Sequence, residues 1–119
     1  MYRQIMIPVD LDHVERPEKA LNTGADLAKL YDAPVCYIGV SGNTPSAVAH
    51  NPTEFAAKMQ AFGESQAQKY GLSKVSTATY ISHDPAVDLD KTLLKAAKEE
   101  GADLVVMASH VPGLAEHLF

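Results

Sequence analysis

The sequence predicts an α/β fold: a doubly wound parallel sheet with helices on both faces. Two observations predict it. Four short apolar runs are rich in β-branched residues, and three amphipathic helical patterns alternate with them. Strands joined through helices of this length make right-handed crossovers, which produce a parallel sheet covered on both sides. The length of 119 residues predicts a single domain, 1–119.

The first strand and helix are marked by a change from an apolar run to helical spacing. Residues 5–9 are apolar, and the run ends at Asp10. Pro17 suits a first helical turn because its missing N–H is not needed there, and Glu18 suits the positive end of the helix dipole. Pro34 ends the pattern. The apolar face of this helix is expected to comprise Ala20, Gly24, Leu27, Ala28 and Tyr31.

The second strand is predicted over residues 34–40, PVCYIGV. Asn51 is expected to cap the second helix, with Pro52 at its first position and Glu54 placed for a capping box. Gly71 ends this helix. Its inner face is expected to comprise Phe55, Met59, Phe62 and Tyr70.

The third strand, the third helix and the fourth strand follow in the same alternation. Residues 75–81, VSTATYI, alternate as a strand does. Asp84 and Pro85 open a helix that Gly101 closes, and residues 102–108 predict a fourth strand. The apolar stripe of this helix is expected to comprise Leu89, Leu93, Ala96 and Ala97.

Composition narrows the classes of partner. The net charge of −5 argues against non-specific binding to nucleic acid or to an anionic membrane. No apolar run approaches the roughly 20 residues of a membrane span, and the N-terminus turns acidic too early for a signal peptide. The single cysteine, Cys36, allows no internal disulfide and fits a reducing cytoplasm. Its place inside an apolar strand predicts an inert core residue.

The candidate site lies at one rim of the predicted sheet. Ligands of doubly wound sheets bind beyond the carboxyl ends of the strands, where the winding reverses. That rule selects residues 8–10, 39–41 and 107–110. Phosphate-loop, dinucleotide-turn, nucleophile-elbow and paired-cysteine motifs are absent. The five histidines are scattered, so no metal site is predicted.

Several motifs carry a specific resemblance. The opening IMIPVDLD resembles the first strand of universal stress proteins, and HDPAVDL, a helix, a Gly-Ala-Asp turn and LVVMASH match that family's order across the chain. ASHVPG is similar to the short, single-domain bacterial members whose phosphate loop starts Ala-Ser-His. The resemblance implies a Rossmann-like fold of the adenine nucleotide alpha hydrolase type. It also implies a cytoplasmic stress-response module that binds ATP or AMP, with Mg²⁺ as an optional companion, and forms a homodimer.

The resemblance also implies roles for individual residues. Pro8, Val9 and Asp10 would border the adenine, with Asp10 accepting hydrogen bonds from the base or the ribose. Val40 would pack on the adenine ring, with Gly39 beside it. The residues implied beside the ribose and at the start of the phosphate loop are Met107, Ala108, Ser109 and His110.

The chain departs from the family's phosphate turn, Gly-x2-Gly-x9-Gly-(Ser/Thr). Ala108 and Val111 stand at the first two glycine positions, and a valine disfavours left-handed backbone geometry. The sequence stops at Phe119, about where the last Gly-Ser is expected. We therefore expect a C-terminally incomplete domain that lacks the last strand and helix and has an unpaired edge at its fourth strand.

Simpler interpretations of the same residues stay open. Asp10 ends a strand in any such fold, and Pro8 is explained equally by a structural irregularity. Gly39 is more simply explained by tight packing of a helix on the sheet. Val40 and Met107 are core residues in any fold of this class.

Two other functions also stay open: a nucleotide-independent interaction module with a decayed site, and a weak ATP hydrolase. Association unaffected by nucleotide would favour the first, and phosphate release that disappears in Asp10→Ala would favour the second. The acidic pairs Asp88/Asp90 and Glu99/Glu100 predict solvated helix faces rather than catalytic dyads. No catalytic residue is therefore predicted.

Overall fold

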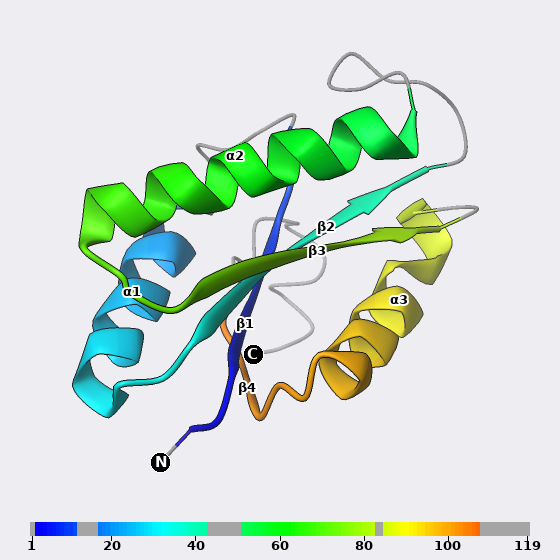
Figure 1. Cartoon of the computed structure of the whole chain (residues 1–119). Helices are drawn as coiled ribbons and strands as arrows, with labels where there is room; N and C mark the ends of the chain where they lie inside the picture. The colour runs from blue at the N-terminus through cyan, green and yellow to red at the C-terminus, as the bar shows by residue number, and fades with distance from the viewer. Residues whose placement is uncertain (1, 12–16, 43–50, 83–84, 108–119) are drawn as a thin grey trace.

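The computed structural model describes residues 2–11, 17–42, 51–82 and 85–107 (Figure 1). The strands are β1 (Ile5–Val9), β2 (Val35–Ser41), β3 (Val75–Ile81) and β4 (Leu104–Val105), and the helices are α1 (Glu18–Tyr31), α2 (Pro52–Tyr70) and α3 (Pro85–Glu99). Strands and helices alternate in the predicted order. No described helix is long and apolar enough to span a bilayer.

The four strands form one parallel sheet in the order β3-β2-β1-β4. The chain winds from β1 outward to β3 and then crosses back to place β4 on the other side of β1 (Figure 1). Helices α1 and α2 pack on one face of the sheet, and α3 packs on the other. The predicted doubly wound α/β fold is confirmed, and its winding reverses between β1 and β4.

The alternation of side chains along β1 and β2 divides the core into two clusters. Ile5 and Ile7 pack with Tyr37 under α1 and α2, and the intervening Met6 packs with Cys36 under α3. All five side chains are fully buried. Burial raises the pKa of the Cys36 thiol, which disfavours the reactive thiolate, and the predicted core position of Cys36 is confirmed.

The helices meet the sheet largely through the predicted faces. Phe55 and Met59 of α2 are buried, and Phe62 and Tyr70 pack partly buried against the same cluster. The stripe on α3 is shorter than predicted. Leu93 and Ala96 are buried, but Leu89 is 39% exposed because α3 meets the sheet through its later turns.

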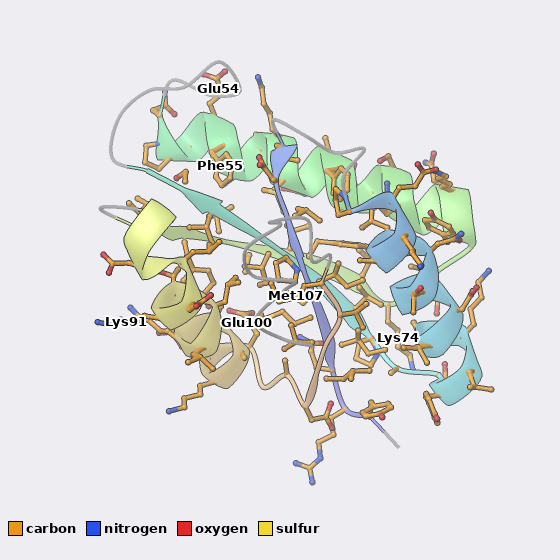
Figure 2. The ribbon with its side chains drawn as sticks, turned by 180° about the vertical axis from the view of Figure 1, so that it is seen from behind. Glu54, Phe55, Lys74, Lys91, Glu100 and Met107 are labelled. Atoms are coloured by element: carbon orange, nitrogen blue, oxygen red, sulfur yellow. The ribbon has the colours of Figure 1, made fainter. Side chains whose placement is uncertain are left out.

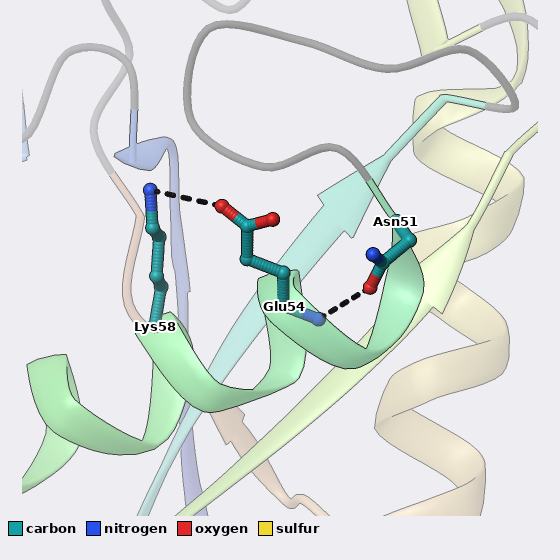
Figure 3. A network of polar contacts seen from close by, with 3 residues as sticks. All are labelled: Asn51, Glu54 and Lys58. Carbon is teal, nitrogen blue, oxygen red and sulfur yellow. Dashed lines mark hydrogen bonds and ion pairs between the residues drawn. The ribbon is translucent and has the colours of Figure 1, made fainter.

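The ends of α2 have the predicted caps. The Asn51 side-chain oxygen accepts a hydrogen bond from the Glu54 backbone N–H at 2.8 Å, and Pro52 occupies the first position (Figure 3). Glu54 also forms an ion pair with Lys58 at 3.6 Å, and Gly71 closes the helix in the left-handed conformation. The predicted cap of α3, Asp84, lies outside the described residues.

The end of α1 differs from the prediction. The helix stops at Tyr31, three residues before Pro34, because Asp32 adopts the left-handed conformation with φ of 50°. The Asp32 N–H donates to the Ala28 carbonyl and so closes the last turn. An αL cap therefore ends α1 before the proline is reached.

Candidate functional site

Strand β1 lies between β2 and β4. Its successive residues direct their backbone N–H and C=O groups alternately toward one neighbour and the other, as in any parallel sheet. The Ile5 N–H donates to the Pro34 carbonyl at 2.9 Å, so odd-numbered residues of β1 direct their backbone groups toward β2. The Met6 carbonyl accepts from the Val106 N–H at 3.0 Å, so even-numbered residues direct theirs toward β4. The backbone of residue 8 therefore faces β4.

Pro8 ends the pairing of β1 with β4. The next donor in this ladder is the N–H of residue 8, directed toward the Val106 carbonyl, and proline has no N–H. Strand β4 accordingly ends at Val105, where the sequence predicted a strand over 102–108; it also begins at Leu104, two residues later than predicted, and Ala108 lies outside the described residues. The predicted strand extends too far at its carboxyl end because the apolar content of a segment does not reveal whether a proline on the adjacent strand removes one of its hydrogen bonds. The pairing of the two strands thus ends before the carboxyl rim, and we call this place the β1–β4 opening.

Two of the predicted site residues face away from α3. Val9 packs in the cluster under α1 and α2, and Gly39 lies beneath α2. A Cβ on Gly39 would lie 2.7 Å from the Met59 sulfur and 2.9 Å from the Phe55 ring. Tight packing of α2 on the sheet thus accounts for this glycine and confirms the simpler interpretation of it.

Three other predicted residues share the opposite, α3-side face. Val40 is half-buried beside the α3 cluster, and the half-buried Pro8 follows the same alternation on β1. On the β4 side, Val106 packs against the α1 and α2 cluster, so the alternation places Val105 and Met107 on the α3-side face. Pro8, Val40 and Met107 therefore lie on one side of the sheet at its carboxyl rim.

This part of the α3-side face is apolar and open within the described structure. Val105 is 41% exposed and Met107 is 46% exposed. Met107 is labelled in Figure 2. The expectation that Met107 is a core residue is wrong. Helix α3 packs on β2 and β3, and no other described helix covers this face over β1 and β4.

The remaining predicted residues are placed only in part. Asp10 is exposed. It directly follows β1, which ends at the rim beside the β1–β4 opening. Ala108, Ser109 and His110 lie outside the described residues. Sequence reasoning missed Val105 and the Val106 carbonyl. Pro8 was the available signal, but its meaning depends on strand order and register.

The described residues hold no cluster of three or more histidine, cysteine, aspartate or glutamate side chains suited to a metal ion. The acidic pair Glu99/Glu100 was predicted to lie on a solvated helix face, but Glu100 has a side-chain hydrogen bond. The Tyr80 hydroxyl donates to a Glu100 carboxylate oxygen at 2.7 Å, and burial followed by this hydrogen bond raises the pKa of Tyr80. Glu100 thus ties the segment that follows α3 to Tyr80 of β3, the residue that pairs with Val40.

A parallel sheet that reverses its winding between β1 and β4, with helices on both faces, defines a doubly wound α/β protein. Within that class, the chain belongs to the universal stress protein family, whose family model matches residues 1–119. A comparison with curated protein sequences finds no match.

Solved structures of this family have the same fold. A universal stress protein family member from Burkholderia pseudomallei is 20% identical, with a TM-score of 0.69 over 98% of this chain and 87% of that one. A universal stress protein in complex with cAMP is 13% identical, with a TM-score of 0.61 over 87% of this chain and 70% of that one. The Archaeoglobus fulgidus protein in complex with dAMP is 17% identical, with a TM-score of 0.53 over 91% of this chain and 98% of that one.

Proposed function

We propose that this chain is a cytoplasmic stress-response module that binds ATP or AMP at the β1–β4 opening. The observation that carries the proposal is the end of the β1–β4 pairing at Pro8, where apolar and acceptor groups lie near the rim. Two relatives of the same fold are in complex with cAMP and dAMP, which both contain adenine and one phosphate group.

The groups at the opening match the chemistry of an adenine nucleoside. Pro8, Val40 and Met107 offer an apolar surface on which a base can lie, and a few polar groups then fix its orientation. The Asp10 carboxylate and the Val106 carbonyl are acceptors suited to ribose hydroxyls and to the adenine amino group. Val9 and Gly39, which face α2, would act by shaping the rim rather than by touching the base.

The phosphates would extend toward Ala108, Ser109 and His110, which follow β4 in the sequence. Mg²⁺ would be held mainly by the phosphates of ATP, as is usual for this ion. We propose binding rather than turnover, with the nucleotide coupled to self-association as a homodimer.

Isothermal titration of the chain with ATP and with AMP tests the proposal. We expect saturable heat with at least one nucleotide and at least tenfold weaker binding for Asp10→Ala, because the variant loses an acceptor at the opening. Asp26→Ala is the matched control, since it removes the same charge from an exposed position on α1. Its affinity should equal that of the unmodified chain.

Two outcomes contradict the proposal. The first is the absence of heat with both nucleotides from protein that circular dichroism shows to be folded. The second is an equal loss of affinity in Asp10→Ala and Asp26→Ala, which would assign the effect to overall charge rather than to the rim.

A further inference from the structure

Strand β3 also ends at the carboxyl rim, and its hydrogen-bond ladder with β2 runs one residue beyond it. The Ser82 N–H donates to the Ser41 carbonyl at 2.8 Å, so Ser82 keeps the register of the strand. Tyr80 and Ala78, two and four residues earlier, pack with the α3 cluster. Because side chains alternate along a strand, the Ser82 side chain is directed to the same α3-side face.

Each strand thus places one residue on the α3-side face at the rim. In sheet order these residues are Ser82, Val40, Pro8 and Met107. The last three are apolar, so the Ser82 hydroxyl is the polar side-chain group of the row. The nearby Tyr80 hydroxyl is already engaged, because it donates to Glu100 at 2.7 Å.

The Ser82 hydroxyl is buried without a partner. Ser82 is 3% exposed, and its Oγ has no hydrogen-bond partner among the described residues. Buried polar groups are nearly always paired, because an unpaired one has lost its hydration without compensation. The two other unpaired buried atoms in the described structure, the Tyr37 hydroxyl and Gln66 Oε1, belong to the core under α2 and to α2 itself. Of the three, Ser82 alone lies beside the candidate site.

We propose that the Ser82 hydroxyl is a hydrogen-bond partner of the nucleotide's purine base, which lies on Val40 with its free edge toward β3. The inference rests on the proposed nucleotide binding. A hydroxyl can donate to a purine ring nitrogen or accept from the 6-amino group. Val40 pairs with Tyr80, so the α-carbons of Val40 and Ser82 lie about 8 Å apart, one strand across and two residues along. A flat purine lying on Val40 bridges this gap.

This contact also sets the direction of the nucleotide along the rim. With the base over β2 and its edge at β3, the ribose lies near Pro8 and Asp10, and the phosphates extend past β4. Each part of the ligand then meets a suitable group: the apolar Val40 and a hydroxyl for the base, and the Asp10 carboxylate for the ribose hydroxyls. The reverse direction would place the charged phosphates on Val40, where burial of an unpaired charge is costly.

The first test combines titration with AMP and chemical denaturation. Ser82→Ala should bind AMP about three- to tenfold more weakly, since it loses one hydrogen bond to the ligand. Without nucleotide its denaturation midpoint should not fall, because the variant removes an unpaired hydroxyl. Ser73→Ala makes the same change at an exposed position between α2 and β3 and should alter neither. Unchanged AMP affinity in Ser82→Ala, or a lower midpoint without nucleotide, would overturn the inference.

The second test determines the direction of the bound nucleotide. Isotope-filtered nuclear Overhauser spectra are recorded on the ¹³C-labelled chain with unlabelled AMP. We expect cross-peaks from the adenine protons to the Val40 methyl groups and to the Ser82 β-protons. Cross-peaks from the adenine protons to the Met107 methyl group, with none to Val40 or Ser82, would reverse the direction and overturn the inference.

These readouts separate the two proposals. Absence of heat with AMP and ATP from the folded, unmodified chain contradicts nucleotide binding itself, and the role of Ser82 with it. AMP binding that Asp10→Ala weakens and Ser82→Ala does not leaves the nucleotide proposal intact and overturns only the base contact.

Discussion

Strand β1 pairs with β2 along all five of its residues but with β4 over only the first two. On the β2 side the chain builds core, and the rim there is closed by packing under α2. On the β4 side the ladder stops at Pro8, and the face beyond it carries half-exposed apolar side chains. One missing N–H thus separates a fully paired flank from a flank whose apolar side chains are half-exposed.

The two flanks also differ in what holds them. The β2 flank depends on buried apolar contacts, which contribute several kcal/mol for each large side chain. The β4 flank depends on a few backbone bonds, each worth about 0.5–1.5 kcal/mol net. Substitutions on the β2 flank should therefore change stability most, and substitutions on the β4 flank should change the local opening.

The largest effect is expected for Gly39→Val. The new side chain would meet Met59 and Phe55, so the free energy of unfolding should fall by about 1–3 kcal/mol, measured by chemical denaturation. Thr79→Val is the control, because residue 79 pairs with Gly39 on the neighbouring strand but is exposed. An unchanged denaturation midpoint for Gly39→Val would contradict the close packing of α2.

Pro8→Ala should change the free energy of unfolding less than Gly39→Val does, and should alter the structure only where β1 meets β4. The new N–H can donate to the Val106 carbonyl and extend the β1–β4 ladder. The gain of about 0.5–1.5 kcal/mol is offset by about 0.4–1 kcal/mol of added chain entropy in the unfolded state. Hydrogen exchange should show a slowly exchanging amide at position 8, and nucleotide affinity should fall as the opening narrows.

Pro52→Ala is the matched control for this experiment. Its new N–H lies in the first turn of α2, where backbone donors have no partner within the helix, so it should exchange fast. If the amide at position 8 exchanges as fast as the one at position 52, Pro8 does not limit the ladder.

The smallest effect is expected at the amino end of the β4 flank. The Asp103 carboxylate accepts hydrogen bonds from the Arg3 N–H at 2.9 Å and the Gln4 N–H at 3.2 Å. These backbone bonds, Arg3 first, lower the pKa of Asp103 from its ordinary value of 3.8. The stability they contribute is present above that value and is lost as the pH falls through the folded-state pKa.

Asp103→Asn should therefore unfold at a lower denaturant concentration than the unmodified chain at pH 7. The difference should shrink as the pH falls below 3.8 and through the lowered pKa, because protonation of Asp103 removes the charge that distinguishes the two chains. Asp26→Asn, on the exposed side of α1, should match the unmodified chain throughout. A pH-independent difference for Asp103→Asn would rule out the ionised carboxylate as the stabilising form.

The elements that local chemistry specifies were predicted well. Strands β1 and β3 have the predicted bounds, and β2 is displaced by a single residue. The Asn51 cap and the Gly71 end of α2 were also predicted, because both depend on residues within one helical turn. The carboxyl end of the fourth strand was predicted too late, because it depends on a residue almost a hundred positions away.

The sequence by itself determined the order of strands and helices, the alternation that separates the two core clusters, and the rim at which the candidate residues gather. Only the tertiary structure decided that β4 lies beside β1, that Pro8 faces it, and that Gly39 and Val40 point to opposite faces of the sheet. The physical reason is the range of the interactions. Caps and periodicity act over a few residues, whereas the meaning of a missing backbone donor depends on which distant strand it would have met.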